Sequence, residues 1–215
     1  MKVLITGAGG FVGKNLQQHL AERKDVEVVC FTRANTVAEL PRLLEGVEFV
    51  FHLAGVNRPQ DPQEFVTGNA DLTAALVQAV EGEMQASGRR IAIVCSSSTQ
   101  AARDNPYGTS KRAAEDVLRA FAARTGAAAH VFRLPNVFGK WCRPNYNSAV
   151  ATFCHNIARG LPIQINDPAA PVTLVYVDDV VERFIELMDG ADAAVDAEGF
   201  ATVTPQYTTT VGELA

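Results

Sequence analysis

Short apolar runs alternate with longer stretches of helical periodicity through the first two thirds of the chain. The apolar runs are continuous rather than alternating, which is typical of strands buried on both faces of a parallel sheet. The predicted strands span residues 2–6, 26–32, 49–54, 90–95 and 129–134, and the predicted helices span 10–23, 37–44, 62–85 and 107–124. This order predicts an α/β fold, a doubly wound parallel sheet with helices on both faces and right-handed crossovers.

The pattern changes after Asn136. The elements that follow are a loop over residues 140–148, a helix over 149–159, a strand over 172–177 and a helix over 180–188. The loop is predicted because its residues are polar and aromatic and include a proline. We therefore expect a core over residues 1–139 and a smaller lobe over residues 140–215, with segments of the lobe returning to the core.

The last residues contain a helix-start signal. Thr210 and Glu213 have the spacing of a capping box, with Thr at the N-cap and Glu at the third helical position. A helix is expected behind such a cap, but the chain stops at Ala215. We therefore expect the lobe to be incomplete and the chain to be part of a longer one. The alternative is a frayed terminal tail.

Composition narrows the class of protein. Hydrophobic residues make up 47% of the 215 residues and charged residues 20%, which excludes intrinsic disorder. A formal charge of −5 argues against nucleic acid as a partner, and no apolar run has the length of a membrane span. The four cysteines have no paired spacing, so we expect a reduced, cytoplasmic protein. Cys154 and His155 lack a second ligand pair, and no metal site is predicted.

A glycine-rich loop joins the first predicted strand to the first predicted helix. It contains Gly7, Gly10 and Gly13, a spacing that differs from G-x-G-x-x-G but serves the same ends. Gly7 allows a tight turn, Gly10 lets the backbone approach a pyrophosphate, and Gly13 lets helix and strand pack closely. The start of the helix then offers free N–H groups to phosphates. The residues expected to contact a dinucleotide here are Gly7, Gly9, Gly10, Phe11, Val12 and Gly13.

The end of the second predicted strand distinguishes between dinucleotides. An NAD site usually has a carboxylate there, which binds the ribose 2′-hydroxyl. This strand ends in Cys30-Phe31-Thr32-Arg33, without an acid. Arg33 lies 20 positions after Gly13, and a guanidinium can bind a 2′-phosphate through two charge-assisted hydrogen bonds. We therefore predict NADP(H) as the cofactor, the alternative being that Arg33 is an ordinary solvated residue.

Three kinds of polar side chain indicate acid–base chemistry. Tyr107 and Lys111 lie one helical turn apart, on one face of a predicted helix. A nearby ammonium favours the phenolate, so we expect Lys111 to lower the pKa of Tyr107. Residues 96–99 (Ser-Ser-Ser-Thr) follow a predicted strand, at the sheet edge where doubly wound folds bind ligands. A hydroxyl there can hydrogen-bond a carbonyl oxygen and stabilise its growing negative charge.

Together these motifs resemble those of the extended short-chain dehydrogenases/reductases. The matching segments are Thr6–Gly13, His52–Gly55, Asn69, Ser96–Ser98, Tyr107 with Lys111, Arg133–Gly139 and Val177–Val180, which span nearly the whole chain. The resemblance implies a dinucleotide-binding core over residues 1–139 and a substrate-binding lobe over residues 140–215.

The same resemblance implies a role for each matching residue. Tyr107 would be the general acid, Lys111 would orient the nicotinamide ribose, and Ser98, or else Ser97, would hold the substrate carbonyl. Asn69 would support a water path to the site. Leu53, Ala54 and Gly55 would line the cofactor, with Pro135 and Asn136 at its nicotinamide end. The residues expected at the substrate are Ser98, Tyr107, Asn136 and Arg143.

A narrower resemblance is to the reductase domain of CapF-type capsular polysaccharide enzymes. It is carried by residues 104–108, 140–148 and 161–167. It implies a nucleotide-linked substrate, a UDP-bearing 4-keto-6-deoxy amino sugar used for surface polysaccharide. CapF-type enzymes also carry a C-terminal cupin epimerase, whose metal-ligand cluster is absent from this chain. A cupin domain beyond residue 215 is therefore expected as a covalent partner.

Reduction is the favoured reaction within this family. Related dehydratases carry Asp and Glu after the catalytic hydroxyl, whereas Thr99 and Gln100 follow Ser98 here. Epimerases usually keep NAD, whereas Arg33 favours NADPH. The alternatives are a nucleotide-sugar 4-epimerase and a non-catalytic NADPH-binding module. We further expect Arg143 near the diphosphate, Trp141 or Tyr146 stacked on the base or sugar, and a homodimer formed through the two long helices.

Overall fold

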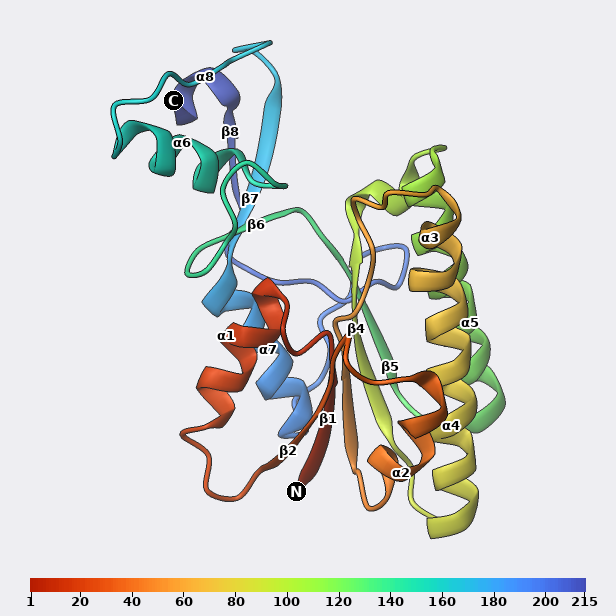
Figure 1. The fold of residues 1–215 in the computed structure, drawn as a ribbon. Coiled ribbons are helices and arrows are strands. Elements are labelled where there is room, and N and C mark those ends of the chain that lie inside the picture. The colour runs from red at the N-terminus through yellow and green to blue at the C-terminus, as the bar shows by residue number, and fades with distance from the viewer.

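The central element of the computed structural model, which describes residues 1–215, is a five-stranded parallel sheet (Figure 1). Its strands are β1 (Lys2–Thr6), β2 (Glu27–Phe31), β3 (Phe49–His52), β4 (Ala92–Ser98) and β5 (Ala129–Leu134), in the spatial order β2-β1-β3-β4-β5. From β1 the chain first adds β2 on one side of β1, and it then returns to add β3 on the opposite side. The reversal point lies between β1 and β3, and doubly wound sheets bind ligands at the carboxyl ends of the strands at such a point.

Helices cover both faces of this sheet. Figure 1 shows α1 (Phe11–Leu20) and α7 (Val177–Met188) on one face, and α2 (Leu40–Leu44), α4 (Leu72–Ser87) and α5 (Pro106–Thr125) on the other. Alternate strand residues feed two separate cores: Val3 and Ile5 pack toward α1 and α7, whereas Leu4 packs toward the other helices. The predicted doubly wound α/β fold is therefore confirmed, with strands buried on both faces.

A second, three-stranded sheet forms the smaller lobe. It pairs β6 (Asn136–Phe138), β7 (Pro171–Tyr176) and β8 (Tyr207–Thr210) in that order, flanked by α6 (Ala149–Ile157) and α8 (Val211–Leu214). The change of sheet falls at Pro135, before the expected boundary at residue 139, because β6 pairs with β7. Thr210 caps α8 in the predicted capping box.

Two predicted elements have different limits in the structure. The long helix expected over residues 62–85 is divided into α3 (Gln63–Phe65), a π-helical turn (Val66–Asp71) and α4. The strand expected to end at Cys95 continues to Ser98, because residues 96–98 pair with Phe132–Leu134 of β5. The serine cluster is therefore part of the sheet rather than a loop after it. A short 3₁₀ helix, Thr99–Ala102, follows at once, and another, Val37–Glu39, precedes α2.

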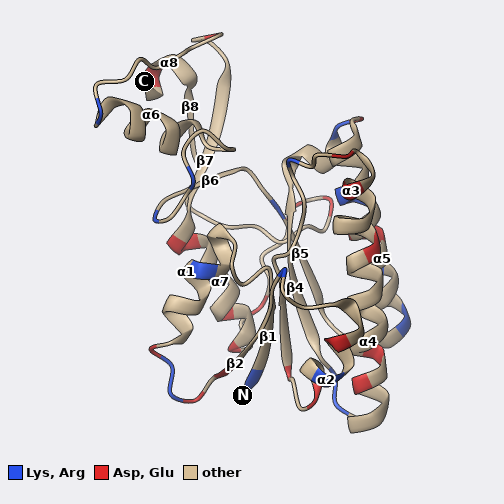
Figure 2. Cartoon of the chain, in the orientation of Figure 1, with Lys and Arg blue, Asp and Glu red and all other residues tan.

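The surface is mixed in charge. Figure 2 shows Lys and Arg interspersed with Asp and Glu over both the central sheet's helices and the smaller lobe. Among the helices, none combines the length and the apolar character that crossing a bilayer would need.

Candidate active site

The glycine loop between β1 and α1 is built for close approach of the backbone. Gly7 has φ +70°, and a Cβ there would come within 2.6 Å of the backbone nitrogen of Ala54. A Cβ on Gly13 would collide with the carbonyl oxygen of Gly7. Gly9, in contrast, faces open space, with nothing within 4 Å of the place of a Cβ. The loop is thus closed toward the protein and open on its outer side.

The first turn of α1 offers donors that no side chain satisfies. Its N-cap, Gly10, has an extended backbone and makes no side-chain cap, and the turn contains no acidic residue. The N–H groups of Phe11, Val12 and Gly13 therefore face outward at the positive end of the helix dipole. Together with the open side of Gly9, this arrangement fits the pyrophosphate of a dinucleotide.

Arg33 lies beside the same loop. The backbone N–H of Gly7 donates to the carbonyl of Phe31 at 3.0 Å, which holds the end of β2 against the loop. Arg33 follows two residues later in an exposed turn and takes part in no ion pair or hydrogen bond. Its guanidinium is therefore free to meet an anion at this edge.

The segment after β3 joins the loop to the acid–base residues. Leu53 and Ala54 donate their N–H groups to the carbonyl and hydroxyl oxygens of Thr6, at 3.1 and 3.2 Å. A Cβ on Gly55 would lie 2.9 Å from the Asn69 Oδ1 atom and 3.5 Å from the Lys111 Nζ atom. The predicted cofactor-lining segment thus runs directly from the glycine loop to the predicted catalytic residues.

Tyr107, Lys111 and Ser98 converge at the carboxyl edge of the sheet. Asn105 caps α5 by accepting a hydrogen bond from the Gly108 N–H at 2.8 Å, and Pro106 occupies the first helical position. Tyr107 is half-buried in the first turn, and the Ser98 hydroxyl lies near enough to its phenol to lower the pKa of the phenol. Lys111, 7% exposed, donates one of its three protons to the Ser96 carbonyl at 2.8 Å.

The pKa values of these groups follow from burial. Burial raises the pKa of the Tyr107 phenol, and the nearby Tyr146 phenol raises it further, against the opposing effect of the Ser98 hydroxyl. Burial also lowers the pKa of Lys111. The expectation that Lys111 lowers the pKa of Tyr107 is therefore wrong for this structure, because the loss of hydration dominates and the ammonium is turned toward Ser96. The phenol is protonated at neutral pH, as a proton donor should be.

Asn69 occupies the π-helical turn. Its Oδ1 atom accepts from the Val56 N–H and its Nδ2 atom donates to the Val56 carbonyl, both at 3.0 Å. The same Nδ2 atom donates to the Ser110 hydroxyl at 2.9 Å, and Ser110 donates to the Tyr107 carbonyl at 2.8 Å. The side chain therefore clamps the segment after β3 to α5. A π-turn inside a helix is often found at functional sites.

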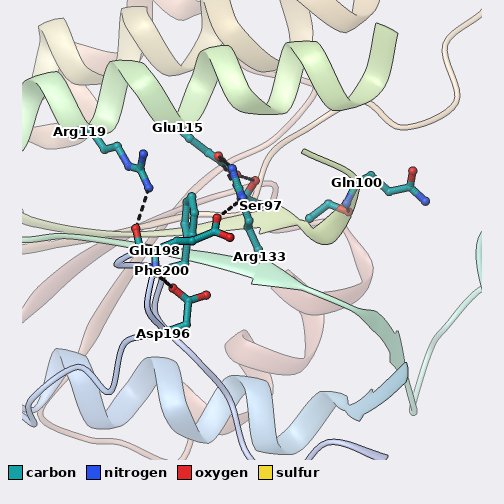
Figure 3. Close-up of polar contacts among 9 residues, drawn as sticks. Ser97, Gln100, Glu115, Arg119, Arg133, Asp196, Glu198 and Phe200 are labelled. Atoms are coloured by element: carbon teal, nitrogen blue, oxygen red, sulfur yellow. Dashed lines mark hydrogen bonds and ion pairs between the residues drawn. The ribbon is translucent and has the colours of Figure 1, made fainter. Parts of the chain in front are cut away.

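A largely buried ion pair between Glu115 of α5 and Arg133 of β5 lies next to the serine cluster (Figure 3). The sequence prediction missed this pair. Glu115, one turn beyond Lys111, accepts from the Ser97 hydroxyl at 2.5 Å and from two nitrogens of Arg133. Arg133 also lies 3.7 Å from the centre of the Phe200 ring. The available signal was the i, i+4, i+8 spacing of Tyr107, Lys111 and Glu115, which places a carboxylate on the buried face of α5.

The smaller lobe brings one predicted aromatic residue to the site and not the other. Tyr146 donates to the Asn57 Oδ1 atom at 2.6 Å, and the guanidinium groups of Arg58 and Arg143 lie 5.2 and 5.4 Å from the centre of its ring. Trp141 instead faces a groove between α1 and β2, on the outer side of the core.

The remaining predicted residues at this edge are accounted for as follows. Pro135 is the residue between β5 and β6, and Asn136, exposed, donates to the Thr173 carbonyl at 3.1 Å. Ser97 points toward α5, whereas Ser98 faces Tyr107, so only Ser98 is placed to meet a substrate at the phenol. No cluster of three or more His, Cys, Asp or Glu side chains is arranged to hold a metal ion.

Comparisons with known proteins agree with this geometry. The sequence pattern of the "NAD dependent epimerase/dehydratase family" matches residues 3–200. The chain is 57% identical to UDP-2-acetamido-2,6-beta-L-arabino-hexul-4-ose reductase of Pseudomonas aeruginosa, over 100% of this chain and 56% of that protein. It resembles the crystal structure of the capsular polysaccharide assembling protein CapF of Staphylococcus aureus with a TM-score of 0.86 and 41% identity, over 100% of this chain and 56% of that one.

A structure of MoeE5 with UDP-glucose and NAD is also similar, with a TM-score of 0.80 and 26% identity, over 100% of this chain and 79% of that one. The chain thus spans little more than half the length of the Pseudomonas and Staphylococcus relatives.

Proposed function

Because the chain belongs to the NAD dependent epimerase/dehydratase family, we propose that it is an NADPH-dependent reductase of a nucleotide-linked 4-keto-6-deoxy amino sugar, carried on UDP. The observation that carries this proposal is the convergence of Tyr107, Lys111 and Ser98 at the carboxyl edge of the sheet. The 57% identity to a UDP-hexulose reductase supports the substrate class.

The cofactor would lie along the carboxyl edge of the sheet. The N–H groups of Phe11, Val12 and Gly13, with the open side of Gly9 and the backbone of Gly10, would hold the pyrophosphate, and Arg33 the 2′-phosphate. Lys111 is buried and has two protons without a protein partner, which suits it to the hydroxyls of the nicotinamide ribose. Pro135 and Asn136 would flank the nicotinamide. When bound, the reduced nicotinamide supplies the hydride that the carbonyl carbon accepts.

The chain's own residues then bind and protonate the carbonyl oxygen. The Ser98 hydroxyl donates a hydrogen bond to this oxygen and stabilises its growing negative charge. The Tyr107 phenol gives the oxygen its proton, which completes the alcohol. Lys111 would hold the nicotinamide ribose through its two free protons, and Asn69 keeps α5 and the segment after β3 in place. The two residues after Ser98 are Thr99 and Gln100, which lie in a 3₁₀ turn and carry no carboxylate. The absence of an acid there supports reduction over dehydration.

The assembly around this site is part of the proposal. Residues 1–139 would form the dinucleotide-binding part and residues 140–215 the substrate lobe, with Arg143 and Tyr146 near the diphosphate and sugar. A homodimer would form through α4 and α5, where outward positions of α5 include the small residue Ala120. Ala114 is buried within its own chain and would not contribute. A C-terminal cupin domain would complete the protein.

The first test removes the proton donor. Tyr107→Phe should reduce the rate of NADPH oxidation with a UDP-linked 4-keto sugar by about 10²–10⁴-fold, the usual contribution of a general acid. The Kd for NADPH should change little, because the ring remains in place. The rate is followed by the absorbance of the reduced nicotinamide. If no 4-keto sugar nucleotide oxidises NADPH with the unaltered protein, the reductase assignment fails.

The second test concerns the choice of cofactor. Arg33→Ala should weaken NADPH binding by about tenfold, as expected for the loss of a charge-assisted pair, and leave NADH binding unchanged. Lys24→Ala, which removes an exposed cation without an ion pair from the turn between α1 and β2, is the matched control. Titration calorimetry of the unaltered protein and both variants with each nucleotide measures the six affinities. An NADPH preference that survives the loss of Arg33 removes this residue from the site.

A further inference from the structure

A line of buried polar side chains runs beneath the site, and the mechanism above does not use it. It consists of Thr6 at the end of β1, His52 at the end of β3 and Thr73 in the first turn of α4, none more than 2% exposed. Thr6 and His52 are neighbours on paired strands. Because polar groups without water must find partners in the protein, their hydrogen bonds can be followed one by one.

The direction of each hydrogen bond is fixed by the carbonyl at one end. Thr73 donates its only hydroxyl proton to the Asn69 carbonyl at 2.7 Å, so it has none left for His52. The Nε2 atom of His52, 2.8 Å from the Thr73 hydroxyl, must therefore carry a proton and donate. The neutral ring then accepts at Nδ1, where Thr6 donates at 2.7 Å, and Thr6 accepts from the Ala54 N–H.

The two ends of this line are parts of the site. At one end, Ala54 lies against Gly7, which leaves no space for a Cβ, so its backbone supports the glycine loop. At the other end, Asn69 donates to Ser110, and Ser110 donates to the Tyr107 carbonyl. A series of hydrogen bonds thus runs from Ala54, which packs against the predicted cofactor loop, through His52 to the backbone of Asn69, and the Asn69 side chain continues it to the backbone of the predicted proton donor.

The surroundings of His52 keep the ring neutral. Burial lowers its pKa to about 3, and the positive charge of Lys111 acts in the same direction. The adjacent strand places Cys95 beside it, and burial raises the pKa of this thiol to about 11, so it is uncharged as well. A second ring proton would also require Thr6 to give up its hydrogen bond to Nδ1.

We propose that His52 is a positioning residue for the reaction, whose neutral Nε2–H ring holds the glycine loop and the first turn of α5 in a fixed relation. The kinetic part rests on the proposed function. The form of the ring and the affinity for NADPH are measured without turnover, so they test the proposal even if the substrate assignment fails.

Two conservative variants separate the two halves of the line. The amide nitrogen of Gln can replace Nε2 and donate to Thr73, whereas the amide oxygen of Asn can replace Nδ1 and accept from Thr6. His52→Gln should therefore keep kcat within about threefold and raise the Kd for NADPH by about tenfold. His52→Asn should keep this Kd within about threefold and lower kcat by about tenfold. His52→Phe, which satisfies neither threonine, should show both losses.

A control and a spectroscopic measurement complete the experiment. Val50→Ala, in the same strand and fully buried, controls for a general loss of stability, and it should change neither Kd nor kcat. Imidazole ¹⁵N NMR of the unaltered protein should show one protonated nitrogen, Nε2, without titration between about pH 5 and pH 9. An Nδ1–H ring, titration in this range, or equal effects of the Gln and Asn variants would overturn the proposal.

Discussion

Arg133 binds two carboxylates that differ in burial and in contact geometry. Glu115 is 2% exposed and makes a two-nitrogen contact with the guanidinium, whereas Glu198 is 71% exposed and lies 3.0 Å from it. The buried partner has lost its hydration and depends on Arg133 and Ser97, while the exposed partner keeps water. The same cation therefore gives an internal comparison of a buried and a surface ion pair.

We predict that the loss of each carboxylate has a different cost. Glu115→Gln should lower the free energy of unfolding by about 3–5 kcal/mol, since Arg133 is left with a poor partner in a buried place. Glu198→Gln should cost less than about 1 kcal/mol. Urea denaturation of both variants measures the difference. Equal losses would mean that the buried pair has no special role in holding Ser97 and α5.

At the scale of elements, α1 packs closely against the loop that follows β1 because Gly13 has no side chain. Gly13 packs its Cα against the carbonyl oxygen of Gly7 and the backbone of Ala8, whereas Gly82 in α4 has nothing within 4 Å of the place of a Cβ. Both glycines are helical, so substitution by alanine adds the same helix propensity at both. Only the space around the new methyl group differs.

Alanine at these two positions should therefore have opposite effects. Gly82→Ala is expected to stabilise the protein by about 0.5–1 kcal/mol. Gly13→Ala is expected to destabilise it by about 1–3 kcal/mol, because helix and loop must separate, and to weaken NADPH binding as the N–H groups of the first turn shift. Thermal unfolding and nucleotide titration report the two effects. A stabilised Gly13→Ala variant would contradict the packing argument.

The sequence predicted the elements whose signals are local. The continuous apolar runs located all five strands of the central sheet, and the glycine loop and the cap at Thr210 were recognised from spacing alone. The π-helical turn at residues 66–71 was missed, because the apolar pattern of residues 62–85 is compatible with one helix and tertiary contacts of Asn69 decide the break.

Strand ends and buried pairs were missed for a similar reason. Ser96–Ser98 are polar, yet β4 continues through them because β5 supplies backbone partners. Glu115 and Arg133 are 18 positions apart, and the His52 line joins three elements. Residue types indicated which groups could react, but only the packed structure shows which groups hold them in place. The roles assigned to Tyr107, Lys111 and Ser98 remain predictions.

At the scale of the molecule, one hydrogen bond links the loop before α6 to the core. Tyr146, from the smaller lobe, donates to Asn57 of the core, and its phenol raises the pKa of Tyr107. This contribution is smaller than those of burial and of the Ser98 hydroxyl. Removal of the Tyr146 hydroxyl should lower the pKa of Tyr107, and the donor would then lose its proton at a lower pH.

We predict that Tyr146→Phe moves the basic limb of the kcat/KM profile to lower pH and costs about 0.5–1.5 kcal/mol of stability. Tyr207→Phe, an exposed tyrosine of β8, is the matched control and should change neither. Rates of NADPH oxidation over a pH series give the limb. A limb that stays in place would show that the lobe does not influence the proton donor.

The return of α7 to the central sheet has a consequence for biosynthesis. Val177, Val180, Val181 and Phe184 pack in one cluster with Val3, Ile5 and Phe51, so one face of the first strands is completed by residues made much later. While the ribosome is still adding these residues, that face is bare and able to associate with other nascent chains. A chaperone that shields apolar strands should therefore bind nascent chains that end before residue 177, and release them once α7 has emerged.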